Sequence, residues 1–256
     1  MLLTIDVGNT QIYCGVLKNK KVIARFRHIS NNIVTADELG VFLLNALTAN
    51  QIKIKEIKQV AISSVVPAIT RSIIHSVKKY FNLKPFVIDD NTKTEIFCKK
   101  CSIHNLGADR LADIEGAFAL HNKNNFLIID FGTAITFDAV TKKGEYLGGA
   151  ICAGPMLSMQ ALASGTALLS TVELKKPRYT AELTTETQIQ AGLVIGTIGL
   201  VKEIISNLKK ECFGKEKVLI IGTGGLGRLF EKENIFDFYE PDLILFGLKT
   251  LIKRNK

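Results

Sequence analysis

The chain has 256 residues, of which 47% are hydrophobic and 22% are charged. This length suits two domains of ordinary size, and this composition excludes a disordered chain. The 33 Lys and Arg exceed the 24 Asp and Glu, which gives a formal net charge of +9 and favours small anionic partners. Because the lysines occur singly or in pairs and form no long basic run, we expect no nucleic-acid partner.

We expect no targeting signal at the beginning of the chain. Asp6 interrupts the first apolar run, and no basic segment precedes it. We also expect no apolar stretch long enough to span a bilayer. The five Cys are an odd number, which favours a reducing compartment. We therefore predict a cytoplasmic protein with no membrane partner.

In the first half of the chain, three short strands precede alternating helices and strands. Gly8 and Asn19 each lie in a turn signal between two of these strands. Thr35 and Glu38 have the spacing of a helix capping box, and Pro67 suits the first turn of a later helix. The predicted strands are 2–7, 12–17, 22–28, 58–63 and 85–88, and the predicted helices are 35–49 and 67–81.

The second half repeats this order after an initial helix. Three strands, a helix, a strand and a helix occur in each half, which indicates an internal duplication. We predict an α/β protein with two similar domains, 1–118 and 119–256, whose mixed sheets face each other across a cleft. The predicted elements here are helices at 107–121, 155–164 and 186–209, a helix that opens near Pro241, and strands at 126–130, 134–140, 145–151 and 217–221.

Two similar stretches occur at matching points of the halves, LTIDVGNT at 3–10 and LIIDFGTA at 127–134. In each, an apolar strand ends in Asp and a Gly turn follows, whose bare amides can approach phosphate oxygens. A carboxylate beside a phosphate needs a cation between them, so we expect Asp6 to act through Mg²⁺. The second copy offers Asp130 and Thr133 in the same way, together with Gly132 and Thr136.

The paired D-x-G hairpins resemble those that the acetate and sugar kinase, Hsp70 and actin superfamily places around ATP. This resemblance implies two duplicated RNase H-like domains that flank a nucleotide. A third element of that superfamily contacts the adenosine, and the turn after the strand 217–221 resembles it. Its candidate residues are Gly222, Gly224 and Gly225.

The stretch LGADRLAD at 106–113 carries a candidate catalytic group. Asp109 precedes Arg110, whose charge stabilises the ionised carboxylate. The start of a helix would stabilise it further. Such a carboxylate can accept a proton from a substrate hydroxyl as that oxygen attacks phosphorus. A surface ion pair at a helix start is the alternative reading of the same residues.

Five motifs in this order and rough spacing resemble those of the type III pantothenate kinases, over essentially the whole chain. The resemblance implies an enzyme that uses ATP to phosphorylate the 4′-hydroxyl of pantothenate, which is the first step of coenzyme A synthesis. The motifs are D-x-G-N-T at 6–10, S-V-V-P at 64–67, G-A-D-R at 107–110, D-F-G-T-A at 130–134 and G-G-A-I at 148–151.

The same resemblance implies roles for individual residues. Asp109 matches the general base, and Asp130 matches the ligand of a monovalent cation, K⁺ or ammonium, while Mg²⁺ accompanies ATP. Gly107, Ala108, Asp109 and Arg110 match the segment that holds pantothenate. Thr185 matches a residue that reaches the substrate across a homodimer interface. The implied ATP contacts are Asp6, Val7, Gly8, Asn9, Thr10, Gln11, Ile12, Tyr13 and Thr133.

The stretch before G-A-D-R departs from that family. Lys100, Ser102 and Ile103 stand where Tyr, Asn or Asp, and Pro are usual, and Lys100 is a further candidate for the substrate pocket. The departures leave two alternatives open: a non-catalytic ATP-binding relative that acts as a regulatory accessory protein, and a kinase for another hydroxy acid. Cys98, Cys101 and His104 could form part of a zinc site, but such a site needs four ligands, so loop thiols are the other reading.

Overall fold

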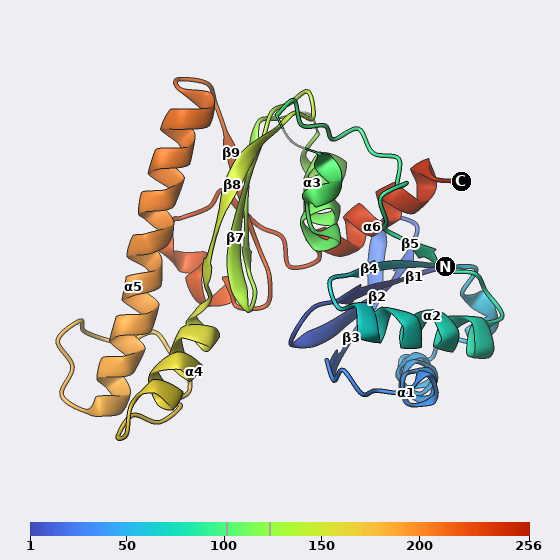
Figure 1. The fold of residues 1–256 in the computed structure, drawn as a ribbon, viewed down its shortest axis with the longest axis horizontal. Helices are drawn as coiled ribbons and strands as arrows, with labels where there is room; N and C mark the ends of the chain where they lie inside the picture. The colour runs from blue at the N-terminus through green and yellow to red at the C-terminus, as the bar shows by residue number, and fades with distance from the viewer. Residues whose placement is uncertain (101, 123) are drawn as a thin grey trace. The chain divides into compact units, whose positions relative to one another are not determined.

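The structure, a computed structural model, describes residues 1–100, 102–122 and 124–256. The chain forms two compact units, one made of residues 1–122 and 242–256 and the other of residues 123–241. Each unit contains a five-stranded sheet with helices packed against it (Figure 1). The units are described below one at a time.

The sheet of the first unit has the order β3-β2-β1-β4-β5. β2 runs antiparallel to β1 and β3, whereas β4 runs parallel to β1 and β5. The elements of this unit are β1 (Leu2–Val7), β2 (Gln11–Lys18), β3 (Lys21–Ile29), α1 (Ala36–Ala49), β4 (Gln59–Ser64), α2 (Pro67–Phe81), β5 (Phe86–Val87), α3 (Ala108–His121) and α6 (Leu243–Arg254), with 3₁₀ turns at Ile54–Glu56 and Ile103–Asn105.

Strand β1 lies at the centre of this sheet, and its apolar run is explained by burial on both faces. α1 and α2 lie on one side of the sheet, and α3 and α6 on the other (Figure 1). Because side chains alternate along a strand, Leu3, Ile5 and Val7 all enter the core that contains the apolar residues of α1 and α2. Burial of these aliphatic groups is the main force that holds the layers together.

The helix starts in this unit follow the local signals of the sequence. At α1, the amide of Glu38 donates to Oγ1 of Thr35 at 3.1 Å, and the amide of Thr35 donates to Oε2 of Glu38 at 2.7 Å. This is the reciprocal pair of a capping box. Pro67 occupies the first turn of α2, which ends at Asn82 in the left-handed conformation with φ 51°. These predicted boundaries are confirmed.

The sheet of the second unit has the order β10-β9-β6-β7-β8. β6 to β10 therefore take the places of β1 to β5, and the predicted duplication is confirmed. The elements of this unit are β6 (Phe126–Phe131), β7 (Ala134–Val140), β8 (Tyr146–Ala153), α4 (Pro155–Gly165), α5 (Thr185–Leu208), a π turn (Lys209–Phe213), β9 (Leu219–Thr223), a 3₁₀ helix (Gly227–Glu233) and β10 (Phe238–Tyr239).

Helix α5 covers one face of this second sheet. Val194, Val201 and Ile205 pack with Leu127 and Ile129 of β6 in one apolar cluster. With the π turn, the helical run Thr185–Phe213 is long and apolar enough to cross a membrane by length and composition, so the prediction that no such stretch exists is wrong. Core helices of soluble proteins pass the same test, so one such helix is weak evidence for a membrane span.

The last helix joins the first unit, whereas the predicted division at 118/119 placed it with the second half. α6 packs tightly on α3. A Cβ on Gly247 would lie 1.7 Å from the carbonyl oxygen of Ala112, and one on Gly116 would lie 2.2 Å from that of Leu243. Glycine at both contacts lets the two backbones touch. This packing joins segments far apart in the chain, so local sequence patterns could not reveal it.

An ionic cluster anchors the start of α6 to the β2–β3 hairpin. The hydroxyl of Tyr13 donates to Oδ1 of Asp242 at 2.6 Å, and the guanidinium of Arg25 donates to both Asp242 oxygens. Arg27 lies over the Tyr13 ring, 4.2 Å from its centroid. Burial raises the pKa of Asp242, but the hydrogen bonds from Arg25 and Tyr13 outweigh burial and hold this pKa below its usual range. The carboxylate is therefore ionised at neutral pH.

We predict that Gly247→Ala lowers the melting temperature by several degrees. The added methyl group must push α6 away from the α3 backbone, and such overpacking costs roughly 1–3 kcal/mol. The matched control is Gly196→Ala in α5, where a Cβ meets no atom within 4 Å. The control should leave the melting temperature unchanged or raise it, because Ala favours helix. Equal melting temperatures for Gly247→Ala and the unmodified chain would contradict the close packing of α3 and α6.

We predict that Asp242→Asn destabilises the chain by about 1–2 kcal/mol at pH 7, because it removes charge-assisted hydrogen bonds while Arg25 stays half exposed. The lowered pKa means that ionised Asp242 stabilises the folded chain above the unfolded-state pKa of about 3.9. This contribution is lost as the pH falls through the folded-state pKa.

Urea unfolding of the Asp242→Asn variant and the unmodified chain at pH 7, 5 and 3.5 measures this contribution. The difference should be constant from pH 7 to pH 5 and should shrink at pH 3.5. Asp90→Asn changes an exposed carboxylate and serves as the control. A difference that does not depend on pH would rule out the ionised carboxylate as its cause.

Candidate functional site

The β1–β2 turn of the first unit, which the sequence predicts to bind phosphate, is held by internal hydrogen bonds and has an exposed tip. The amide of Gly8 donates to the carbonyl of Gln11 at 3.0 Å, and Oγ of Ser30 donates to the carbonyl of Gly8 at 2.6 Å. These bonds fix the turn, while the side chains of Asn9 and Thr10 are exposed at its tip. The turn can therefore present amide, hydroxyl and main-chain donors to an anion.

The other residues of the predicted ATP segment are placed differently. Asp6 is half-buried and pairs with Tyr13 across the β1–β2 ladder, and Gln11 is exposed. The side chains of Val7 and Ile12 are in the core, at 0% and 1% exposure, so only their main chains are available to a ligand. Tyr13 directs its hydroxyl to Asp242. The sequence did not reveal this bond, because its partner lies near the end of the chain.

Parallel pairing brings a second segment to the same edge of the sheet. Asp6 pairs with Ser63, and the amide of Val65 donates to the carbonyl of Val7 at 3.1 Å. The S-V-V-P motif therefore continues from the end of β4 beside the phosphate turn. Oγ1 of Thr70 donates to Oγ of Ser64 at 2.6 Å, which ties this motif to α2. The motif was visible in the sequence, but its place beside the phosphate turn was not.

The G-A-D-R segment begins α3 at this edge, with Gly107 as the N-cap. A Cβ on Gly107 would lie 3.9 Å from Cγ1 of Val65 and only 2.5 Å from Oδ1 of Asp109. Oδ1 of Asp109 also accepts a hydrogen bond from the amide of Arg110 at 2.8 Å. Glycine therefore leaves room for the Asp109 carboxylate to fold back over the helix start, where the helix dipole favours negative charge.

The surroundings of this segment are polar and partly open. Residues 107–110 are half-buried, and Lys100 is exposed in the irregular stretch before them. A small cavity of about 140 Å³ adjoins Ala108, and Asp89, Asp90 and Ile103 also line it. One of the residues that depart from the resembled family, Ile103, thus lies beside the predicted substrate segment.

In the second unit, two of the predicted turns meet. β6 and β9 are parallel, and Asp130 pairs with Thr223. A Cβ on Gly224, which has φ +85°, would lie 2.1 Å from Oδ1 of Asp130 and 2.6 Å from the amide nitrogen of Phe131. Only glycine fits at this position. The Asp130 carboxylate therefore lies directly against the main chain of the glycine-rich turn.

The D-F-G-T turn is also packed on the start of α4. The amide of Gly154 donates to the carbonyl of Thr133 at 3.0 Å, and a Cβ on Gly154 would lie 2.5 Å from the carbonyl oxygen of Gly132. The side chain of Thr133 is exposed, and Thr136 pairs with Asp130 across the β6–β7 ladder, as Tyr13 does with Asp6. The two D-x-G hairpins thus share one geometry.

The three glycines predicted to contact adenosine have different environments. Gly222 is buried, and a Cβ there would lie 2.6 Å from the ring of Phe236, so this glycine serves packing. Gly224 lies against Asp130, and its carbonyl accepts a hydrogen bond from the hydroxyl of Tyr239 at 2.9 Å. Gly225 is exposed, with no atom near its Cβ position. The backbone at Gly225 is the part of the turn open to a ligand.

Two further sets of candidate residues lie outside these turns. Thr185 is exposed in the first turn of α5, whose N-cap is Thr184. Of the stretch that could bind zinc, Cys101 lies outside the described residues. Across residues 1–100, 102–122 and 124–256, no group of three or more His, Cys, Asp or Glu is arranged to hold a metal ion.

Solved structures of other proteins share this architecture. The ROK hexokinase of Thermus thermophilus superposes with a TM-score of 0.55 at 13% identity, covering 100% of this chain and 99% of its own. The component A of (R)-2-hydroxyglutaryl-CoA dehydratase from Acidaminococcus fermentans gives a TM-score of 0.53 at 15% identity, with coverage of 100% and 99%. At these identities the likeness concerns the fold, and it confirms the predicted duplicated, actin-like α/β class.

Sequence comparison is more specific. The family model described as type III pantothenate kinase matches residues 2–207. A protein of that name from Elusimicrobium minutum is 49% identical over 256 residues, covering 100% of this chain and 99% of the relative. Another from Legionella pneumophila strain Corby is 40% identical over 255 residues, with coverage of 100% and 99%. The chain belongs to the type III pantothenate kinase family.

Proposed function

We propose that this protein uses ATP to phosphorylate the 4′-hydroxyl of pantothenate, giving 4′-phosphopantothenate in the first step of coenzyme A synthesis. The observation that carries the proposal is the position of Asp109. Its carboxylate lies at the start of α3, near Val65 after β4, whose amide is hydrogen-bonded to Val7 at the end of β1. A base and a phosphate-binding turn at one edge of a sheet suit transfer of a phosphoryl group to an alcohol.

In this mechanism Asp109 orients the hydroxyl of pantothenate and accepts its proton. Oδ1 already accepts a hydrogen bond from the amide of Arg110, so we assign Oδ2 to the hydroxyl. Because the transition state of phosphoryl transfer is loose, the base contributes mainly by positioning the attacking oxygen. The guanidinium of Arg110 would pair with the pantothenate carboxylate, and Gly107, Ala108 and Lys100 are the further candidates for contact with this substrate.

Each unit supplies groups suited to ATP. In the first unit, the donors of the Gly8–Thr10 turn would bind phosphate oxygens. In the second unit, the exposed hydroxyl of Thr133 and the open backbone at Gly225 would contact the nucleotide. Glycine at position 224 keeps the second turn close to Asp130. These assignments use main-chain and uncharged side-chain donors, which bring no negative charge near the phosphates.

Two cations would accompany the nucleotide. Asp130 presents a carboxylate beside the glycine-rich turn, and a hard oxygen donor of this kind suits K⁺ or ammonium. A monovalent cation there would reduce the repulsion between Asp130 and the nucleotide phosphates. Mg²⁺ would arrive with ATP and contact Asp6 indirectly through water.

We further propose that the protein is a cytoplasmic homodimer with no membrane or nucleic-acid partner. The homodimer is proposed from the resemblance to the family, in which the residue that Thr185 matches contacts the substrate of the other protomer. The position of Thr185 on the exposed first turn of α5 supports that assignment. The charge of +9 suits two anionic substrates.

Incubation of the purified protein with ATP, Mg²⁺ and pantothenate, with and without K⁺, tests the proposed reaction. Mass spectrometry should detect 4′-phosphopantothenate, and more of it with K⁺. ATP binding without any phosphorylated product would favour a non-catalytic accessory protein. Turnover with another hydroxy acid but not with pantothenate would replace the substrate assignment.

We predict that Asp109→Asn lowers kcat by at least about 100-fold, since general bases contribute roughly 10²–10⁴-fold. The dissociation constant for ATP should change little, because nucleotide contacts are assigned to other residues. Gly107→Ala should lower kcat in the same direction, because its methyl group would displace the Asp109 carboxylate. Steady-state kinetics and calorimetric ATP titration measure the two quantities.

Glu211→Gln removes an exposed carboxylate and provides the control for this pair of variants. Its kcat should equal that of the unmodified protein. Unchanged kcat in Asp109→Asn would remove the base assignment, and loss of ATP binding in that variant would show that Asp109 belongs to the nucleotide site.

We predict that Asp130→Asn raises the K⁺ concentration needed for half-maximal activity by at least about tenfold, because an amide binds a cation more weakly than a carboxylate does. The measurement is a K⁺ titration of kcat at saturating ATP and pantothenate, with constant ionic strength maintained by a large organic cation. An unchanged K⁺ titration would show that the cation, if it binds, uses other ligands.

A further inference from the structure

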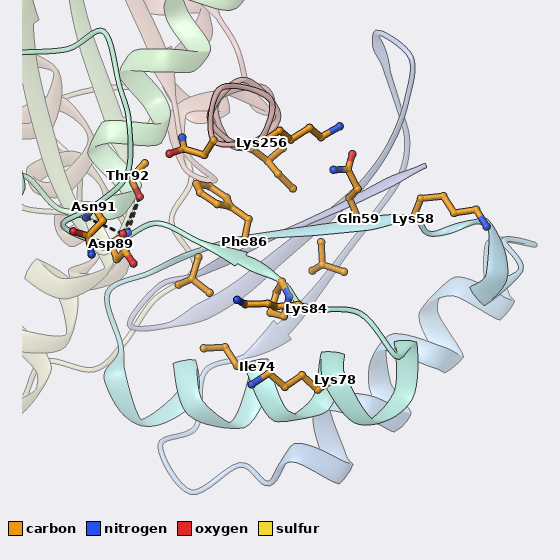
Figure 2. A pocket seen from close by; sticks show the side chains of 15 residues that line it. Lys58, Gln59, Ile74, Lys78, Lys84, Phe86, Asp89, Asn91, Thr92 and Lys256 are labelled. Carbon is orange, nitrogen blue, oxygen red and sulfur yellow. Dashed lines mark hydrogen bonds between the residues drawn. The ribbon is translucent and has the colours of Figure 1, made fainter.

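The first unit contains a second, larger cavity that none of the predicted site residues lines. Its volume is about 670 Å³, which is within the range of small-molecule sites. It surrounds β5, the strand at the edge of the sheet (Figure 2). Val87 of this strand packs with the α1–α2 side of the core, and Phe86 projects from the other side toward α6 (Figure 2).

The Gln59 end of this cavity is distant from the β1–β2 turn, whereas Asp89, on its other side, also lines the small cavity beside Ala108. Gln59 lines the cavity and pairs with Leu2 at the beginning of β1, whereas Asp6 pairs with Ser63 at the opposite end. Four residues of a strand span about 13 Å. A ligand at the Gln59 end of the cavity would therefore not overlap the β1–β2 turn.

Positive charge dominates the lining. Lys58, Lys78, Lys84 and Lys256 contribute four ammonium groups, and Asp89 carries the single side-chain carboxylate among the lining residues. The first three lysines come from the chain before β4, from α2 and from the loop before β5, and all are exposed. Within the part of the chain that the structure describes, no ion pair engages any of these lysines.

The side-chain carboxylate of Asp89 is already engaged. Its Oδ1 accepts hydrogen bonds from the amide of Asn91 at 2.9 Å and from Oγ1 of Thr92 at 3.3 Å. Figure 2 shows these bonds on one side of the cavity, while Lys78 and Lys84 lie beside Ile74 below β5. On this side of β5 the cavity thus combines unneutralised positive charge with apolar surface from Ile74 and the half-buried Val87.

The edge strand itself gives one explanation for the lysines. Lysines, proline and short length protect sheet edges from pairing with other chains. β5 has two residues and follows Pro85, which carries no N–H. An added peptide strand would therefore find few main-chain partners here. Edge protection requires no cavity, however, and it does not explain why apolar side chains line this one.

We propose that this cavity is a second ligand site, which binds a small anion that has a phosphate or carboxylate group and an apolar part. Lys78 and Lys84 bind the anionic group, and Ile74 and Val87, on the same side of β5, contact the apolar part. Charge-assisted hydrogen bonds from two ammonium groups supply the specificity for an anion. This proposal is independent of the kinase activity, because binding alone tests it.

Isothermal titration calorimetry with 1-naphthyl phosphate tests the site directly. The titration contains excess ATP and Mg²⁺, so that phosphate-binding turns elsewhere are occupied. Inorganic phosphate and 1-naphthol are titrated separately, because each carries one half of the proposed ligand. 1-Naphthyl phosphate should bind at least tenfold more tightly than either. No detectable binding of 1-naphthyl phosphate at millimolar concentration would overturn the proposal.

The variants locate the binding. Lys78→Gln combined with Lys84→Gln should weaken binding at least tenfold, and Lys84→Gln alone should weaken it by less. Lys142→Gln combined with Lys143→Gln removes the same charge from an exposed turn of the second unit and should leave binding unchanged. Equal weakening in both double variants would mean that only overall charge matters, and equal binding in all variants would place the ligand elsewhere. Both outcomes would overturn the proposal.

Discussion

Parallel pairing of two buried strands in each unit decides where the polar residues of this chain gather. β1 with β4, and β6 with β9, are mostly apolar and carry polar groups near their carboxyl ends. Because the strands are parallel, those ends lie at one edge of each sheet. Asp6 meets Ser63 there, and Asp130 meets Thr223. Burial of the strands therefore fixes the position of residues that contribute little to the core themselves.

Close backbone contact then determines which side chains these edges tolerate. Gly107 makes room for the Asp109 carboxylate, and Gly224 does the same for Asp130. In both places a methyl group would lie within 2.5 Å of a carboxylate oxygen. The glycines thus hold two acidic groups against main chain, where amides and a helix start can stabilise their charge. The same absence of a side chain at Gly116 and Gly247 lets α6 pack on α3.

The two copies of the repeated unit have diverged in what surrounds the shared hairpin. In the first, Tyr13 lies opposite Asp6 and is bound to Asp242 at the start of α6. In the second, Thr136 takes the equivalent place opposite Asp130, and the glycine-rich turn covers the carboxylate. One inherited geometry therefore supports a hairpin anchored by an ionic cluster in one unit and a carboxylate packed on main chain in the other.

The sequence by itself determined the elements, the duplication and the choice of candidate site residues, because periodicity, capping signals and turn glycines are local properties. Thr35 with Glu38 and the D-x-G turns are examples. Tertiary structure alone decided which unit contains α6 and which residue hydrogen-bonds to Tyr13. It also decided the burial of Val7, Ile12 and Gly222 and the presence of the cavity around β5. Each of these depends on contacts between segments distant in the chain, whose packing geometry no local pattern encodes.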